Sequence, residues 1–433
     1  MITFAVRGDV AGLGAAERSI LFDRSTSEDA ALRAHTASII ARVRAEGDAA
    51  LHAFARDFDG AVLTSLEVPR TLWKAARDGL EPALRRALER ASENIRAAHE
   101  AFRPAASEFI TADGVVIGRR PDPLGRVGVY APGGKATYPS SVLMGVTPAR
   151  VAGVAEIILC SPPGPSGRPS DVVLAAAAIA GADRVFAVGG AGAVAAMAYG
   201  TATIPRVDRI VGPGNAYVAE AKLQVGGAVA IDSPAGPSEL LVVADDSADA
   251  DVAAREIVAQ AEHDPRAAVV LVTSSPSLAP AVASRIERYV ATAPRAAIIR
   301  DALASRGGLL SVGTLAEAEA FASRYAAEHV LVLCREPDAV AGRIRNAGTI
   351  FIGTPSSVAF GDYLTGANHV LPTGGLARSY SGLSTVDFCR WTTWQRVDRS
   401  AATRLASDVG LLADAEQLPG HAAAARHWVE VAR

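Results

Sequence analysis

The sequence has little of what marks disulfide-stabilised, membrane-spanning or nucleic-acid-binding proteins. Its 433 residues include only three cysteines, which lie far apart, so a metal cluster of paired thiolates is excluded and the usage suits a reducing compartment. No apolar run reaches membrane-spanning length, and the first residues lack the order of a signal peptide. The formal net charge is only -3, which provides no electrostatic footprint for nucleic acid or acidic lipid. We therefore expect a cytoplasmic protein whose partner is a small molecule, with no nucleic acid and no membrane bound.

Aromatic residues are also scarce, at 5%, although half of the chain is hydrophobic. The interior must therefore be filled by Ala, Val, Leu and Ile, which is usual where helices cover parallel sheets. A chain of this length suggests two or three units of about 100–200 residues. The composition predicts an α/β protein.

The spacing of apolar residues supports this fold class. Residues 28–57 and 72–102 have helical periodicity. Short β-branched runs then alternate with Ala-rich segments, which predicts βαβ units in two parallel sheets. The first series of strands is expected at residues 127–130, 156–159, 184–188 and 209–211, and the second at residues 240–243, 269–272, 309–312, 329–333 and 349–352. The break near residues 234–237 separates the series, and after about residue 384 helical periodicity returns in a tail that we expect to cross a dimer.

Glycine and proline turns follow several predicted strands, as at residues 132–134 and 212–214. Such strand ends line the ligand crevice of open α/β sheets. Residues 190–195 fit a loose dinucleotide fingerprint, with Asp208 at about the distance of its acidic partner. Tight packing of a strand against a helix accounts for the same glycines without a cofactor.

Gln260 and His263 form the first candidate metal-binding pair. Their spacing of three places both on one face of a helix, where they could reach one ion, and His is the commonest metal ligand. The alternative is that His263 is simply a polar residue in the last helical turn, favoured there by the helix dipole.

Three further segments carry candidate residues. Glu328 and His329 open a predicted buried strand and could form an acid/base pair, although a solvated loop before the strand accounts for them equally. Residues 361–375 are rich in polar, aromatic and glycine residues, as in loops that build sites, and include Asp362 as an anionic ligand. In the tail, Glu416 and His421 are five residues apart across a Pro-Gly turn.

Together these segments resemble the histidinol dehydrogenase family, in the family's order and over nearly the whole chain. The resemblance is carried by RVGVYAPGG (126–134), YPSSVLM (138–144), VGPGNAYV (211–218), AGPSE (235–239), QAEH (260–263), EH (328–329), GDY (361–363) and NHVLPT (368–373). It implies a zinc-dependent enzyme that oxidises L-histidinol to L-histidine through an aldehyde kept in the site, with two NAD, in the last steps of L-histidine biosynthesis.

The resemblance also implies the fold, the domains and the roles of residues. It suggests two Rossmann-like domains of the aldehyde-dehydrogenase-like kind, with a helical N-terminal segment, a helical tail and a homodimer that shares active sites. The expected domains are 1–24, 25–129 with 240–383, 130–239 for NAD, and 384–433. The implied ligands of one zinc ion per subunit are Gln260, His263, Asp362 and His421. The substrate would touch these four as well as Ser238, His329 and Glu416. Glu328 and His329 would be catalytic, and Tyr130, Gly192 and Asn215 would contact NAD.

Three positions depart from the family's usual pattern. Gly192 and Val358 replace Gln and Glu, and Ala327 replaces Pro. Gly192 removes a side-chain donor near NAD, whereas Val358 removes a carboxylate but no metal ligand.

Other functions remain open from the sequence. A related zinc dehydrogenase could act on another small polar alcohol, such as a sulfonated propanediol, but Glu416 suits the cationic groups of histidinol. A metal-dependent hydrolase could use Glu328 to activate water. A non-catalytic binding protein is disfavoured because every expected catalytic position is filled.

Overall fold

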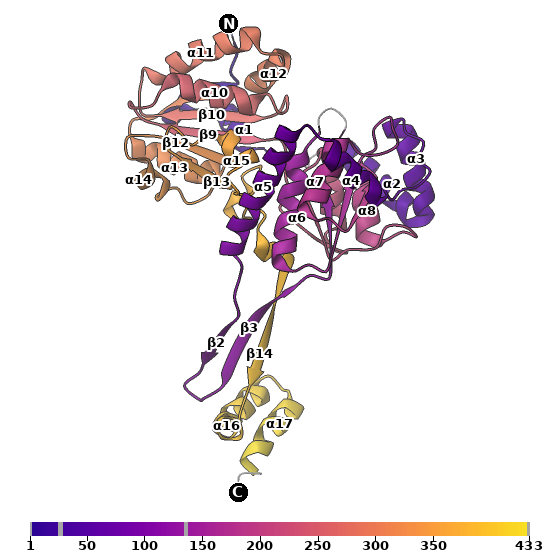
Figure 1. Ribbon diagram of the computed structural model, residues 1–433. Coiled ribbons are helices and arrows are strands. Elements are labelled where there is room, and N and C mark those ends of the chain that lie inside the picture. The colour runs from indigo at the N-terminus through magenta and orange to yellow at the C-terminus, as the bar shows by residue number, and fades with distance from the viewer. Residues whose placement is uncertain (1, 25–28, 134–136, 431–433) are drawn as a thin grey trace. The chain divides into compact units, whose positions relative to one another are not determined.

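The computed structural model describes residues 2–24, 29–133 and 137–430 (Figure 1). The chain forms two compact units, Met1–Phe102 with Gly125–Phe388, and Arg103–Leu124 with Cys389–Arg433. Gly134 of the predicted turn 132–134, and residue 25 at the predicted first domain boundary, lie outside the described residues.

A six-stranded parallel sheet forms one half of the first unit, in the order β1-β11-β10-β9-β12-β13. Its strands are β1 (Val6–Asp9), β9 (Glu239–Ala244), β10 (Ala268–Thr273), β11 (Gly308–Ser311), β12 (His329–Leu333) and β13 (Thr349–Ile352). Five of these were predicted as the second series. The strand β1 was not predicted, because it is a four-residue edge strand with three exposed residues and no apolar run.

Helices cover both faces of this sheet, as Figure 1 shows for α10–α12 on one face and α13 and α14 on the other. The helices around the sheet are α1 (Ala15–Phe22), α10 (Ala250–Ala261), α11 (Leu278–Thr292), α12 (Ala296–Arg306), α13 (Leu315–Tyr325), α14 (Pro337–Ala341) and α15 (Val358–Tyr363). The strands are buried on both sides, which is why their sequences are nearly continuous apolar runs.

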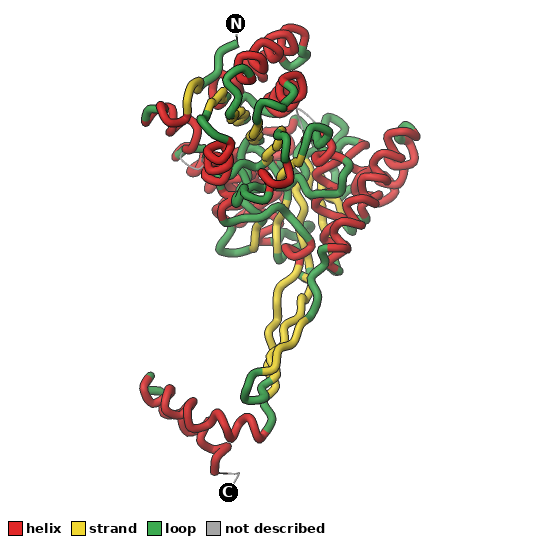
Figure 2. Tube along the Cα trace, turned by 90° about the vertical axis from the view of Figure 1, so that its left-hand side faces the viewer, coloured by secondary structure: helices red, strands yellow, loops and turns green. Residues whose placement is uncertain are grey.

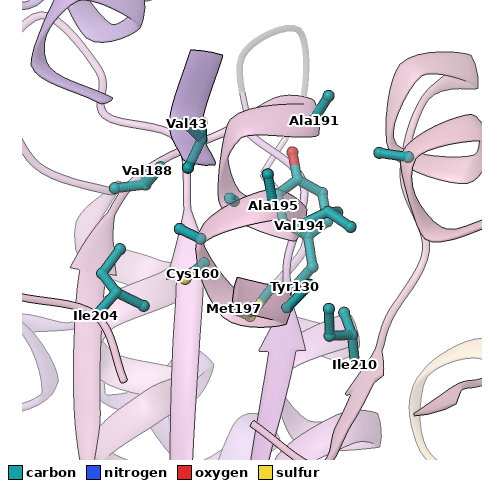
Figure 3. Close-up of a cluster of buried hydrophobic side chains, with 14 of the residues drawn as sticks. Val43, Tyr130, Cys160, Val188, Ala191, Val194, Ala195, Met197, Ile204 and Ile210 are labelled. Carbon is teal, nitrogen blue, oxygen red and sulfur yellow. The ribbon is translucent and has the colours of Figure 1, made fainter. Parts of the chain in front are cut away.

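The second sheet of the first unit is also parallel, in the order β6-β5-β4-β7-β8. Its strands are β4 (Arg126–Tyr130), β5 (Glu156–Ser161), β6 (Arg184–Ala187), β7 (Arg209–Val211) and β8 (Ala230–Ile231). Its own helices are α6 (Pro139–Ala152), α7 (Asp171–Ala180), α8 (Gly190–Tyr199) and α9 (Ala216–Val225). Figure 3 shows the core between α8 and the sheet, where Tyr130, Cys160 and Met197 meet.

The N-terminal helices pack on this second sheet layer. They are α2 (Ala30–Glu46), α3 (Asp48–Asp59), α4 (Arg70–Gly79) and α5 (Pro82–Ala101). Helix α2 contacts α8 and α9, α4 contacts α7, and α5 contacts α6. The predicted domains instead group residues 25–129 with residues 240–383, and that division stays a prediction.

The second unit combines an antiparallel sheet with two helices. The strands β2 (Ser107–Ile110), β3 (Val116–Pro123) and β14 (Cys389–Arg396) pair in the order β14-β3-β2 and form a narrow ribbon (Figure 2). The helices α16 (Arg399–Ala415) and α17 (Pro419–Glu430) pack on each other. The prediction that strands stop at about residue 384 was wrong, because β14 is rich in Trp and Thr but has no buried residue and so lacks an apolar alternation.

The predicted α/β fold, with two parallel sheets, helices in the N-terminal quarter and a helical tail, is confirmed. Within the described residues, no helix combines the length and hydropathy needed to span a membrane.

Candidate active site

His329 and Glu328 lie where β12 begins, between β9 and the edge strand β13 of the six-stranded sheet. Both are buried, at 3% and 7% exposure. Nδ1 of His329 is 3.0 Å from the carbonyl oxygen of Glu239. Because a carbonyl can only accept, Nδ1 carries a proton and Nε2 is the nitrogen that can exchange one. Nε2 lies 3.5 Å from Oδ1 of Asp362.

The two carboxylates beside His329 control its ionisation. Burial alone would lower the pKa of His329, but the charges of Glu328 and Asp362 and their hydrogen bonds outweigh burial and raise that pKa to about 10. Burial raises the pKa of Glu328, which His329 partly opposes. Burial also acts to raise the pKa of Asp362, but contact with His329 leaves it below its usual range. In this arrangement Asp362 is a carboxylate at neutral pH and His329 is protonated, so His329 becomes a proton acceptor only when the charge of its carboxylate neighbours is offset.

Gln260 and His263 come together at the end of α10. The helix ends at Ala261, so Gln260 lies in its last turn and His263 lies just beyond it rather than inside the helix as predicted. The His263 amide donates to the Gln260 carbonyl at 3.4 Å, and its Nδ1 is 3.5 Å from Oγ of Ser238. His263 is also close enough to Asp362 to lower the pKa of that carboxyl.

These side chains suit a zinc ion. Gln260 is 3% exposed, and none of the hydrogen bonds found among the described residues involves its side chain, so its amide oxygen is available to another partner. With His263 and Asp362 it gives a set of nitrogen and oxygen donors that zinc accepts. No cluster of three His, Cys, Asp or Glu side chains able to hold a metal ion is found in residues 2–24, 29–133 and 137–430. Gln260 is not one of those residue types, so this site contributes only His263 and Asp362 to such a cluster. With Gln260 the site has three donors, and a four-coordinate zinc ion needs one more.

Glu239 and Arg24 organise the acid/base pair, although the sequence predicted no role for either. The Glu239 amide donates to Oε2 of Glu328 at 2.8 Å, while the Glu239 carbonyl accepts from His329. The Glu239 carboxylate accepts from the Glu328 amide at 3.3 Å and from the Gly374 amide at 2.8 Å. Arg24 Nε donates to the same carboxylate at 2.7 Å. A charged residue at the first position of an otherwise apolar strand is the signal that could have revealed Glu239.

The loop after α15 is held by its own polar residues. His369 Nδ1 donates to the carbonyl of Asp362 at 2.7 Å, and burial lowers the pKa of His369, which keeps it neutral. The Asn368 amide donates to the carbonyl of Met144 in α6 at 2.8 Å. His369 therefore ties this loop to the end of α15, which carries Asp362.

The acid/base and metal candidates gather at the amino-terminal edge of the six-stranded sheet, since Ser238 and Glu328 precede β9 and β12. By contrast, the NAD candidates lie at the carboxyl edge of the five-stranded sheet. Tyr130 ends β4, and its hydroxyl accepts from the Gly190 amide at 3.1 Å, which fixes it at the start of α8. Burial raises the pKa of Tyr130 to about 12, so the phenol stays neutral.

Asn215 lies at the same edge and caps α9. Its Oδ1 accepts from the amides of Tyr217 and Val218 at 3.0 and 3.2 Å, so only its amide nitrogen remains for a ligand. Gly212, just before it, has φ +114°, and a Cβ there would be 2.1 Å from the Tyr130 carbonyl oxygen. Only glycine fits between Asn215 and Tyr130 at this position.

The glycine fingerprint at residues 190–195 lies at a turn from a strand to a helix, as predicted, because α8 begins at Gly190, shortly after β6 ends. A Cβ on Gly192 would be 3.1 Å from Phe54 of α3, so this glycine allows the two helices to approach closely. The prediction that Asp208 is the acidic partner of this fingerprint was wrong. Asp208 precedes β7, and its carboxylate accepts a hydrogen bond from the Arg126 amide where β4 begins. Asp208 is thus at the edge opposite Gly190.

Glu416 and His421 belong to the second unit. Glu416 follows the last residue of α16, His421 lies in the first turn of α17, and both are exposed. The roles of these two residues stay predictions, as do those of the other site residues.

Comparison with known proteins identifies the family. The family model described as histidinol dehydrogenase matches residues 22–428. The histidinol dehydrogenase of Methanosarcina barkeri is 45% identical over 95% of both chains, and that of Halobacterium salinarum is 48% identical over 96% of this chain and 97% of the relative. The crystal structure of histidinol dehydrogenase from Elizabethkingia anophelis covers 100% of this chain and 99% of its own, with a TM-score of 0.94 and 32% identity. On these matches, the chain belongs to the histidinol dehydrogenase family.

Proposed function

We propose that this chain oxidises L-histidinol to L-histidine in two successive NAD-dependent steps, through L-histidinaldehyde, at the end of L-histidine biosynthesis. Family membership supports the overall reaction. The structural observation that carries the chemistry is the buried pair Glu328 and His329, whose Nε2 faces Asp362 at 3.5 Å. A cytoplasmic location stays a prediction.

Zinc held by Gln260, His263 and Asp362 would supply Lewis-acid polarisation and a fixed position for the substrate, and NAD would accept the hydrides. Tyr130 and Asn215 suit NAD because they lie at one edge of the five-stranded sheet. Gly192 brings no side chain to that edge, so contact there would come from the backbone of α8.

His329 and Glu328 divide the proton transfers. Neutral His329 takes the proton of the alcohol at Nε2 in the first oxidation, because Nδ1 is already committed to the Glu239 carbonyl. A zinc ion on Asp362 would offset the charge that raises the pKa of His329, and would so favour this neutral form. Glu328 takes a proton from the water that adds to the aldehyde. Its raised pKa makes it a better proton acceptor than an exposed carboxylate. Ser238 would contact the substrate, which its position 3.5 Å from Nδ1 of His263 supports.

A homodimer with shared sites completes the proposal. His421 as the fourth metal ligand and Glu416 as a partner for the cationic substrate would come from a second copy of the chain. Their exposure on the second unit supports this, because exposed side chains are available to another subunit.

Purified protein with zinc, L-histidinol and excess NAD is expected to form two NADH for each L-histidine, because both oxidations release a hydride. The measurement is NADH absorbance together with quantification of L-histidine. A sulfonated propanediol serves as the control substrate and should give little NADH. One NADH per product, or none, would contradict the proposal.

Removal of the metal with a chelator is expected to lower NADH formation at least about 100-fold, because Lewis-acid polarisation supplies several kcal/mol to the transition state. Stoichiometric zinc should restore the rate. Full activity in protein shown to be metal-free by elemental analysis would rule out a catalytic zinc.

A further inference from the structure

A buried hydrogen bond joins the two helices that carry the metal candidates. Oε2 of Glu256 in α10 accepts from the backbone amide of Val358, the first residue of α15, at 3.1 Å. Both residues are buried, with exposures of 8% and 2%. Water therefore competes little for this bond, and the two helices are tied at a defined point.

In each helix, the bonded residue lies at the same distance in sequence from a metal candidate. Glu256 precedes Gln260 by four residues, and Val358 precedes Asp362 by four residues. Residues four apart lie one above the other on the same helix face, about one turn along the axis. The link between the helices is thus one turn away from Gln260 on one side and from Asp362 on the other.

Local capping does not replace this bond. The first amides of a helix have no partner within the helix, and Ser357, which precedes α15, provides no side-chain cap. Glu256 supplies the acceptor instead, and its negative charge suits the positive end of a helix. Among the described residues, its carboxylate makes no ion pair and no other hydrogen bond. Burying a carboxylate with a single hydrogen-bond partner costs free energy, so a gain in stability does not account for Glu256 and its contact with α15 does.

We propose that Glu256 is a positioning residue for the metal site: by holding the start of α15 against α10, it sets the separation between the Gln260 and His263 donors and Asp362, and so the zinc affinity. This inference rests on the proposed zinc site. It concerns a residue that touches neither metal nor substrate, and it predicts an effect on metal binding that can be measured without turnover.

The two ends of the bond can be deleted separately. Glu256→Ala removes the acceptor. Glu256→Gln keeps a side chain of the same length that ends in an acceptor oxygen. Val358→Pro removes the donor and keeps an apolar side chain in the core, because proline is accepted at the first helical position. Ser357, with φ -61° and ψ 137°, already has the extended conformation that a residue before proline prefers.

The measurement is zinc affinity of the full-length apoprotein, by competition with a colorimetric zinc chelator. Glu256→Ala and Val358→Pro are each expected to weaken zinc binding about 10- to 100-fold, as is typical when an outer-shell partner of a metal ligand is lost. Glu256→Gln should stay within about threefold of the wild type, and the double variant should be no weaker than either single variant, because both remove one bond.

Glu319→Ala is the matched control, because Glu319 is also a buried carboxylate but bonds to Arg343 on the opposite face of the sheet. It should lower thermal stability and leave zinc affinity unchanged. If Glu256→Ala does not fold, Val358→Pro carries the test. Wild-type zinc affinity in Val358→Pro or a folded Glu256→Ala overturns this inference and leaves the proposed function standing. A wild-type protein that binds no zinc overturns the inference and the zinc site together.

Discussion

Replacement of His329 by asparagine is expected to lower kcat for L-histidinol oxidation about 100- to 10,000-fold, the usual contribution of a positioned general base. An asparagine amide can still donate to the Glu239 carbonyl, which is 3.0 Å from His329 Nδ1, but it cannot take a proton at the position of Nε2. Bound zinc should be retained, because His329 is not among the proposed ligands. The measurements are NADH formation at saturating substrate and the zinc content of the purified variant.

The control for this variant is His99→Asn, since His99 is another buried histidine, 4% exposed and bonded to Thr385 rather than to the acid/base pair. It should turn over at close to the wild-type rate. A normal rate in His329→Asn would place the base elsewhere. A loss of zinc along with activity would instead make His329 a metal ligand.

Most strands of both parallel sheets could be predicted from the sequence because they are buried on both faces, whereas the partly exposed edge strands β1 and β8 could not. A segment such as residues 269–272 must be apolar at every position when helices cover it from both sides, and a short apolar run between two Ala-rich helices is typical of such a strand. The strand β14 lacked this signal, because it pairs in a ribbon without buried residues. Its partner β3 lies about 270 residues earlier in the chain, as in the pair Thr392 and Asp122, and no local pattern encodes such a pairing.

In the candidate site too, local sequence patterns predicted some groupings of residues, whereas contacts between distant segments could not be predicted. Glu328 and His329 are adjacent in the chain, and Gln260 and His263 share the end of one helix, so local spacing was enough to group each pair. The contact between His329 and Asp362 depends on how α15 packs. The role of Glu239 depends on Arg24, which is 215 residues away. Such contacts arise from the tertiary fold, and the residue types alone do not specify them.

Replacement of Arg24 by methionine is expected to lower the free energy of unfolding by about 3–5 kcal/mol, because it leaves the Glu239 carboxylate buried without its cation. The side chains of this ion pair are only 4% and 3% exposed, at an Nε–Oε1 distance of 2.7 Å. Arg24 also donates to the carbonyls of Leu21 and Tyr325, both at 2.8 Å. Urea unfolding at fixed protein concentration, with zinc absent, measures the loss.

The surface pair Arg42–Glu46 is the control, because its side chains are 42% and 46% exposed; Arg42→Met should change stability by less than about 0.5 kcal/mol. Replacing Glu239 by methionine as well as Arg24 removes the unpaired charge, but the amides of Glu328 and Gly374 then lose their acceptor. The double variant should therefore recover only part of the stability. Its kcat should also fall, because the segment that holds Glu328 and His329 is loosened. Full recovery of stability with normal kcat would show that the Arg24–Glu239 pair neither stabilises the fold nor positions the acid/base residues.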